Sequence, residues 1–126
     1  MNVELAPDIK KIVNQMVPYL SFAAYIDPKR IICMRSHKTT SRARARIWSF
    51  PKIWQMALKL PAYYVIEVLS HHFDRLSEDD KARVIIHELM HIPKNFSGAL
   101  VPHRGLHKRI NRGTVETLFR QYKESI

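Results

Sequence analysis

The stretch His87-Glu88-Leu89-Met90-His91 decides how the rest of this sequence is interpreted. In a helix, residues four apart lie about one turn apart on the same face, so both imidazoles could reach one metal ion. Glu88 lies beside that face, where its carboxylate could act on a metal-activated water without binding the metal itself. The pattern therefore indicates the metal-binding helix of a zinc hydrolase.

The residues around this motif favour a helix that is buried in the protein. Ser77 is a suitable N-cap, and the acidic run 78–80 that follows suits the positive end of the helix dipole. Pro93 ends the helical pattern. Apolar residues line one face of this segment, namely Val84, Ile85, Leu89 and Ile92. The alternative interpretation is a core helix with hydrogen-bonded histidines, but two imidazoles and a carboxylate are costly to bury without a partner.

Length and composition are those of an ordinary globular protein. The 126 residues predict a single domain over 1–126, and 46% hydrophobic with 25% charged residues excludes a disordered chain. No apolar run approaches the roughly 20 residues of a membrane span, and the N-terminus lacks signal-peptide features, so we expect a cytoplasmic protein without membrane contact. Cys33 is the only cysteine, which excludes an internal disulfide and a thiolate zinc cluster.

Basic residues are unevenly distributed along the chain. The formal net charge is +10, and residues 28–66 hold nine lysines and arginines but no acid. Arg42, Arg44 and Arg46 alternate with apolar residues, as on one face of a strand. Such a face favours a nucleic acid or another polyanion, or an acidic substrate. A solvated basic surface is the alternative interpretation.

The remaining segments predict an α+β fold. We expect a zincin-like arrangement in which a small, mainly antiparallel three-stranded sheet packs against the motif helix, with helices at both ends of the chain. The first two strands are expected to pair with each other in antiparallel fashion. The expected elements are helix 7–20, strand 30–35, strand 42–50, a short helix from 51 to near 61, strand 62–69 and a C-terminal helix containing residues 115–122.

A catalytic zinc usually takes three protein ligands, so a third residue has to join His87 and His91. The metzincin spacing does not apply, because Lys94 and Ser97 stand where that class has glycine and histidine. The downstream candidates are His103, His107 and Glu116. We favour His103, since its loop is short enough to fold back over the helix end, whereas two basic residues directly follow His107.

Several segments of the chain together resemble a known family. They are Asp27-Pro28, Arg46-Ile47-Trp48, Pro51-Lys52-Ile53-Trp54-Gln55, Tyr64-Val65-Ile66-Glu67-Val68, Phe73-Asp74-Arg75-Leu76-Ser77, the motif through Ile92-Pro93, Phe96-Ser97-Gly98 and Pro102-His103. The chain resembles the small archaeal and phage-type metallopeptidases, which look like minimal zincins with an HExxH motif. The resemblance implies metal ligation by His87, His91 and His103, and a general base at Glu88. Family members tend to carry a second glycine where this chain has Ala99.

These observations predict a zinc-dependent metallopeptidase that binds one catalytic Zn²⁺ and hydrolyses peptide bonds with a metal-activated water and Glu88 as general base. A strand edge could hold the peptide or protein substrate in an extended form. The main alternative is a nucleic-acid-associated protein, either an SprT-like protease acting near DNA or a binding module with a structural zinc. A third is a toxin or a hydrolase of non-peptide amides. The pattern leaves the substrate and the oligomeric state open.

Overall fold

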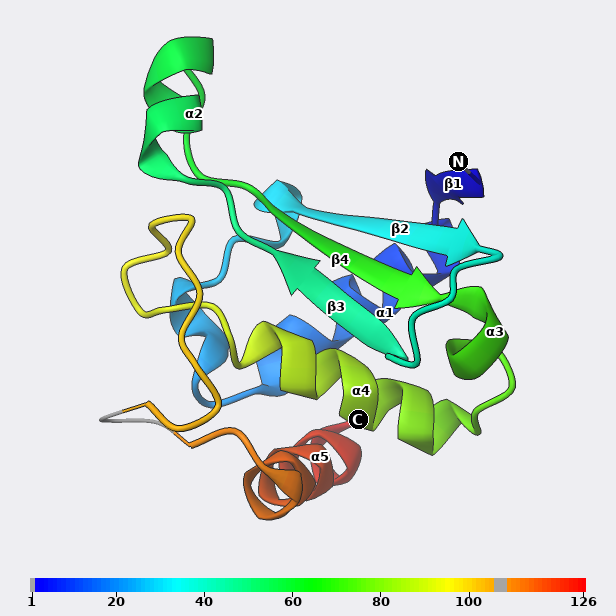
Figure 1. The fold of residues 1–126 in the computed structure, drawn as a ribbon. Helices are drawn as coiled ribbons and strands as arrows, with labels where there is room; N and C mark the ends of the chain where they lie inside the picture. Colours follow the sequence, from blue (N-terminus) through cyan, green and yellow to red (C-terminus); the bar gives the residue numbers. More distant parts are fainter. Residues whose placement is uncertain (1, 106–108) are drawn as a thin grey trace.

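The computed structural model describes residues 2–105 and 109–126, which form an α+β fold with a four-stranded mixed sheet and five α-helices (Figure 1). The strands are β1 (Asn2–Leu5), β2 (Ile31–His37), β3 (Ala45–Trp48) and β4 (Tyr64–Leu69). The helices are α1 (Pro7–Met16), α2 (Lys52–Leu58), α3 (Ser70–Phe73), α4 (Glu78–Leu89) and α5 (Arg112–Ser125). Three short 3₁₀ turns lie between α1 and β2.

The strand order in the sheet is β1-β2-β4-β3. The two central strands, β2 and β4, are parallel and align Ile31 with Tyr64, while each outer strand is antiparallel to its neighbour. A parallel pair needs a long crossover connection. Here the chain between β2 and β4 contains both β3 and α2, and β3 returns to pair with the far side of β4 (Figure 1).

The expected three-stranded, mainly antiparallel sheet is therefore wrong in two respects. Strands 30–35 and 42–50 were expected to pair, but β4 lies between the corresponding strands β2 and β3. The apolar runs of β2 and β4 are typical of neighbouring parallel strands, a pattern that periodicity alone does not distinguish. The fourth strand, β1, escapes prediction because all four of its residues are exposed and show no burial pattern.

The core lies between one face of this sheet and the helices. Alternate residues of β4, Tyr64, Ile66 and Val68, are fully buried on that face. They join α1 and α4 residues in one cluster among the described residues, including Ile9, Val13, Met16, Ile85 and Leu89. Burying one such side chain stabilises the fold by roughly 1.5–3 kcal/mol. Because α4 packs against both β3 and α5, the core fixes its position relative to the edge of the sheet (Figure 1).

Local signals define the first long helix, which begins at Pro7, and the start of α4. The helix expected over 7–20 ends at Met16, because Pro18 lacks the N–H that would continue the hydrogen-bond ladder. The Ser77 side chain caps α4 by accepting a hydrogen bond from the Asp80 N–H at 3.1 Å, as the sequence predicts.

The basic strand is shorter than expected and one of its arginines is already paired. Residues 42–44 precede β3 rather than belonging to it. Arg46 donates to both carboxylate oxygens of Glu67 on β4, at 2.7 and 3.2 Å, and the Trp48 indole donates to the same group. The hydrogen bond from Arg46 holds the pKa of Glu67 at about 2. Of the three arginines expected on one strand face, only Arg46 therefore lies in β3, and its guanidinium group is paired with Glu67.

Within the described ranges, none of the helices has the length and apolar character that crossing a membrane requires.

Candidate metal centre

The motif histidines lie at the C-terminal end of α4, but only His87 belongs to the helix itself. The helix ends at Leu89, and His91 occupies the turn that follows. This turn is tight, because the His91 N–H donates to the Glu88 carbonyl at 3.1 Å, three residues back instead of four. The expectation that both histidines lie in one regular helix is thus corrected, although their ring centroids are still 5.2 Å apart.

His103 comes from a distant part of the chain and completes a cluster of three imidazoles. Its Nε2 lies 3.2 Å from Nε2 of His87, and its ring centroid lies 4.6 Å from that of His91. One ligand nitrogen from each ring can be chosen so that all three lie within 4.8 Å of one another. Two nitrogens bound to one tetrahedral zinc at about 2.1 Å would be about 3.4 Å apart. The donor set and the closest pair therefore fit a zinc ion.

A hydrogen bond fixes the orientation of His91. Its Nδ1 lies 2.6 Å from the Val101 carbonyl oxygen, which can only accept, so Nδ1 carries the proton. This places the lone pair on Nε2, the usual arrangement for a metal ligand whose other nitrogen is held by a carbonyl. The Val101 N–H in turn donates to the His91 carbonyl at 2.8 Å. The chain just before His103 is thus joined to the end of α4.

The segment between α4 and His103 is held by side chains from β4 and α2. The Tyr64 hydroxyl accepts a hydrogen bond from the Gly98 N–H at 2.8 Å and donates to the Ala99 carbonyl at 2.7 Å. The Gln55 amide donates to the Ser97 carbonyl at 2.7 Å. In addition, the Phe50 N–H donates to the Gly98 carbonyl at 2.8 Å. These contacts satisfy the backbone of a segment that has no regular secondary structure.

Gly98 is the position at which this segment tolerates no side chain. Its φ is +94°, a region that residues with a Cβ rarely adopt. A Cβ there would also collide with the carbonyl oxygen of Phe50 and the amide of Gln55. Ala99, where family members tend to have a second glycine, is not among the positive-φ residues, so alanine is compatible with this backbone.

Burial controls the charge of the motif residues. Burial, together with the nearby His91 and His103, lowers the pKa of His87 to about 4, so this imidazole is neutral at pH 7. Neutral imidazole is the form that binds metals. Glu88 is 7% exposed, and burial alone raises its pKa to about 7. A carboxyl group with this pKa can both accept and release a proton near neutral pH.

The two other candidates for the third metal ligand were Glu116 and His107, and the structure describes only the first of them. The Glu116 carboxylate accepts a hydrogen bond from Arg83 at 2.9 Å, and this interaction lowers its pKa. It belongs to an ion pair between α5 and α4, whereas the three histidines form a separate cluster. His107 lies outside the described residues.

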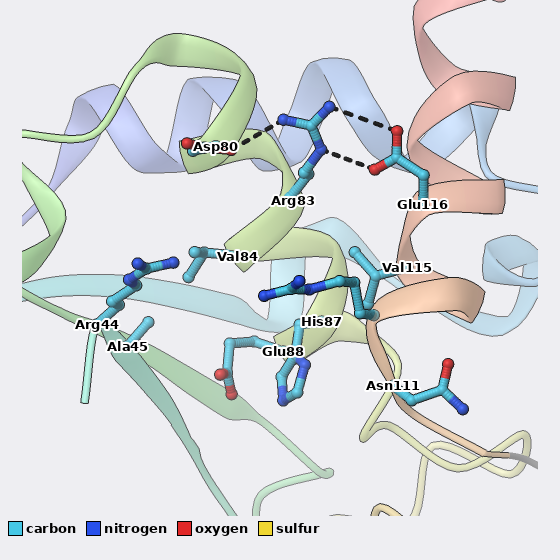
Figure 2. A pocket seen from close by; sticks show the side chains of 11 residues that line it. Arg44, Ala45, Asp80, Arg83, Val84, His87, Glu88, Asn111, Val115 and Glu116 are labelled. Atoms are coloured by element: carbon cyan, nitrogen blue, oxygen red, sulfur yellow. Dashed lines mark hydrogen bonds and ion pairs between the residues drawn. The ribbon is translucent and has the colours of Figure 1, made fainter.

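Two adjoining clefts open onto the histidine cluster. The larger, of about 680 Å³, lies between β3, α4 and α5. Figure 2 shows Arg44 on the β3 side and Val115 on the α5 side, with Glu88 between them. The smaller cleft, of about 280 Å³, is lined by all three histidines and by Ala45 to Ile47 of β3. The imidazoles and Glu88 are thus reachable along the edge strand of the sheet.

Sequence reasoning missed the residues that position His103. Tyr64 and Gln55 were assigned only to their strand and helix, and their hydrogen bonds to residues 97–99 depend on contacts between distant segments. The Ser97-Gly98 pair was the available signal, since a glycine beside a motif often marks a backbone that needs positive φ.

At one cleft of this α+β chain, three histidines that could hold a metal ion thus lie beside a buried glutamate. Comparison with family models identifies the family: the model described as "Putative phage metallopeptidase" matches residues 1–123, and the chain belongs to this family. Searches of curated proteins and of solved structures gave no match.

Proposed function

We propose that this protein is a zinc-dependent metallopeptidase whose catalytic site is the histidine cluster with Glu88, in a single zincin-like domain. The observation that carries the proposal is the convergence of His87, His91 and His103 beside a buried carboxylate. Membership of a metallopeptidase family supports a peptide or protein substrate. The donor set supports zinc, since three imidazoles with one open position are a common catalytic zinc arrangement.

Each side chain has a separate role in this proposal. His87, His91 and His103 hold the ion, and the Val101 carbonyl keeps the His91 ring in the required tautomer. Zinc, when bound, acts as a Lewis acid that acidifies water and polarises the scissile carbonyl. Glu88 accepts the proton of the attacking water and then delivers it to the departing amine.

The edge of the sheet offers a place for the substrate backbone. β3 is the last strand in the order, so its outer edge has no strand partner within the described part of the chain. The same strand lines both clefts that reach the histidines. An extended peptide that adds to this edge would form main-chain hydrogen bonds and pass across Glu88.

The replacement Glu88→Gln tests the proposed base directly. The amide keeps the size of the side chain but cannot accept a proton from water, so we expect hydrolysis to fall by roughly a hundredfold or more. Cleavage of a mixed peptide library should be measured by mass spectrometry, with the zinc content of each protein measured in parallel.

The matched control is Glu78→Gln, which makes the same change in the exposed first turn of the same helix. It should keep both zinc and activity. Turnover by Glu88→Gln equal to that of the unaltered protein would refute the catalytic assignment.

A further inference from the structure

Three arginines and three acids line the larger cleft, and two of the acids, Asp80 and Glu116, pair with the same arginine. The arginines are Arg44, Arg83 and Arg112. Arg83 donates hydrogen bonds to two of these acids, to Asp80 of α4 at 2.8 Å and to Glu116 of α5 at 2.9 Å (Figure 2). Its guanidinium group is therefore occupied by contacts within the protein.

Arg44 and Arg112 differ from Arg83 in this respect. Among residues 2–105 and 109–126, neither has a carboxylate within ion-pair distance. They come from opposite walls, because Arg44 directly precedes β3 and Arg112 is the first residue of α5. The backbone of Arg44 is fixed where the Leu69 N–H donates to its carbonyl at 2.9 Å. The cleft thus presents one guanidinium group on each wall, and neither is in an ion pair with another described residue.

The ligand that suits this arrangement is a carboxylate. Guanidinium groups bind carboxylates through paired, charge-assisted hydrogen bonds. Apolar side chains, including Ala45, Val84 and Val115, also line the cleft, which suits the methylene groups of an amino-acid side chain. Because Glu88 and His87 form part of the same lining, the bound group would lie near the proposed reaction centre.

We propose that Arg44 and Arg112 bind a carboxylate of the peptide substrate, so that the enzyme selects peptides with an acidic residue or a chain-terminal carboxylate near the scissile bond. This inference rests on the proposed peptidase function, because it assigns the cleft to that substrate. It also gives the basic segment before β3 a specific role.

The test measures binding rather than cleavage, which separates this proposal from the catalytic one. Zinc-loaded Glu88→Gln protein is titrated into fluorescein-labelled Ala/Ser peptides that differ only in one central residue, Glu or Gln, and fluorescence anisotropy is recorded. A second pair ends in a free carboxylate or an amide and distinguishes the two sources of the group. We expect the carboxylate form of at least one pair to bind better by about fivefold or more, the effect of two partly exposed ion pairs.

The double replacement Arg44→Gln/Arg112→Gln should abolish this preference without changing zinc content. The control is Arg42→Gln/Arg75→Gln, which removes the same charge from exposed residues that do not line the cleft and should retain the preference. Equal loss in both double variants would show a general charge effect and overturn the proposal. So would equal binding of all peptides, or displacement of the acidic peptide by a DNA oligonucleotide whose own binding needs Arg44 and Arg112. Failure of the unaltered protein to cleave any peptide would refute the proposed function but leave the binding preference measurable.

Discussion

Helix α4 and the segment 97–103 each bring part of the candidate centre into place, and they do so by different means. In α4, the positions of His87 and Glu88 follow from a capped helix with one buried face. In the segment 97–103, no regular secondary structure is present, and the path to His103 depends on hydrogen bonds from β4, from α2 and from Phe50, which lies two residues before α2.

This difference separates candidate ligands that are encoded locally from a candidate ligand whose position depends on tertiary contacts. Small changes far from the histidines should therefore disturb His103 while leaving the α4 residues in place. The same contacts keep backbone polar groups of residues 97–101 satisfied, so we expect stability and the proposed metal binding to be coupled in this segment.

The largest expected effect comes from replacing Gly98 with alanine. The new Cβ would strain a backbone with φ of +94° and collide with the carbonyl of Phe50, so residues 97–99 would have to move. We expect a loss of about 3–4 kcal/mol in the free energy of unfolding, together with weaker zinc binding. Chemical denaturation and zinc titration of the same preparations would measure both.

Gly113→Ala is the matched control for this change. Gly113 lies in α5, and its added Cβ would meet only the Asn111 side chain, at 3.3 Å. Its effect on stability should stay within about 1 kcal/mol, the usual difference between alanine and glycine in a helix. Equal stability of Gly98→Ala and Gly113→Ala would contradict the account of the segment 97–103.

A smaller effect is expected from Tyr64→Phe. This change removes the hydroxyl between Gly98 and Ala99 and leaves a buried N–H without its partner. We expect a loss of about 1–3 kcal/mol in the free energy of unfolding. Zinc affinity should fall as well, whereas far-ultraviolet circular dichroism should retain the helical signal of α4.

The neighbouring Tyr63→Phe provides the comparison for Tyr64. Tyr63 lines an apolar cleft beside Trp48 and Val65, and its hydroxyl has no hydrogen bond among the described residues. Its removal should leave stability and zinc binding almost unchanged. If both replacements lowered zinc affinity equally, the Tyr64 hydroxyl would not be a positioning group.

The sequence predicts the elements whose signals lie close together in the chain. The N-cap at Ser77 and the proline at the start of α1 are such signals, and both helices begin where they indicate. The α+β class also follows from local patterns. The sheet order does not, because the patterns of β2 and β3 do not say which of them neighbours β4 or on which side.

The candidate centre shows the same division. His87, Glu88 and His91 can be recognised from their spacing, but spacing could not choose among the candidates for third ligand. The structure brings His103 to 3.2 Å from His87 through contacts of Val101 and Gly98, which no periodic pattern encodes. The ion pair between Arg46 and Glu67 could not be predicted for the same reason. These residues face each other only because of the register in which β3 pairs with β4.

A competitive zinc titration of His103→Ala tests the three-histidine site itself, with the unaltered protein, Glu116→Gln and His107→Ala as references. We expect one tightly bound zinc in all references. For His103→Ala we expect a loss of zinc affinity of more than about a hundredfold, since losing a ligand should cost more than losing its hydrogen-bond partner. Undiminished affinity in His103→Ala, with loss of zinc from His107→Ala or Glu116→Gln, would contradict the three-histidine site.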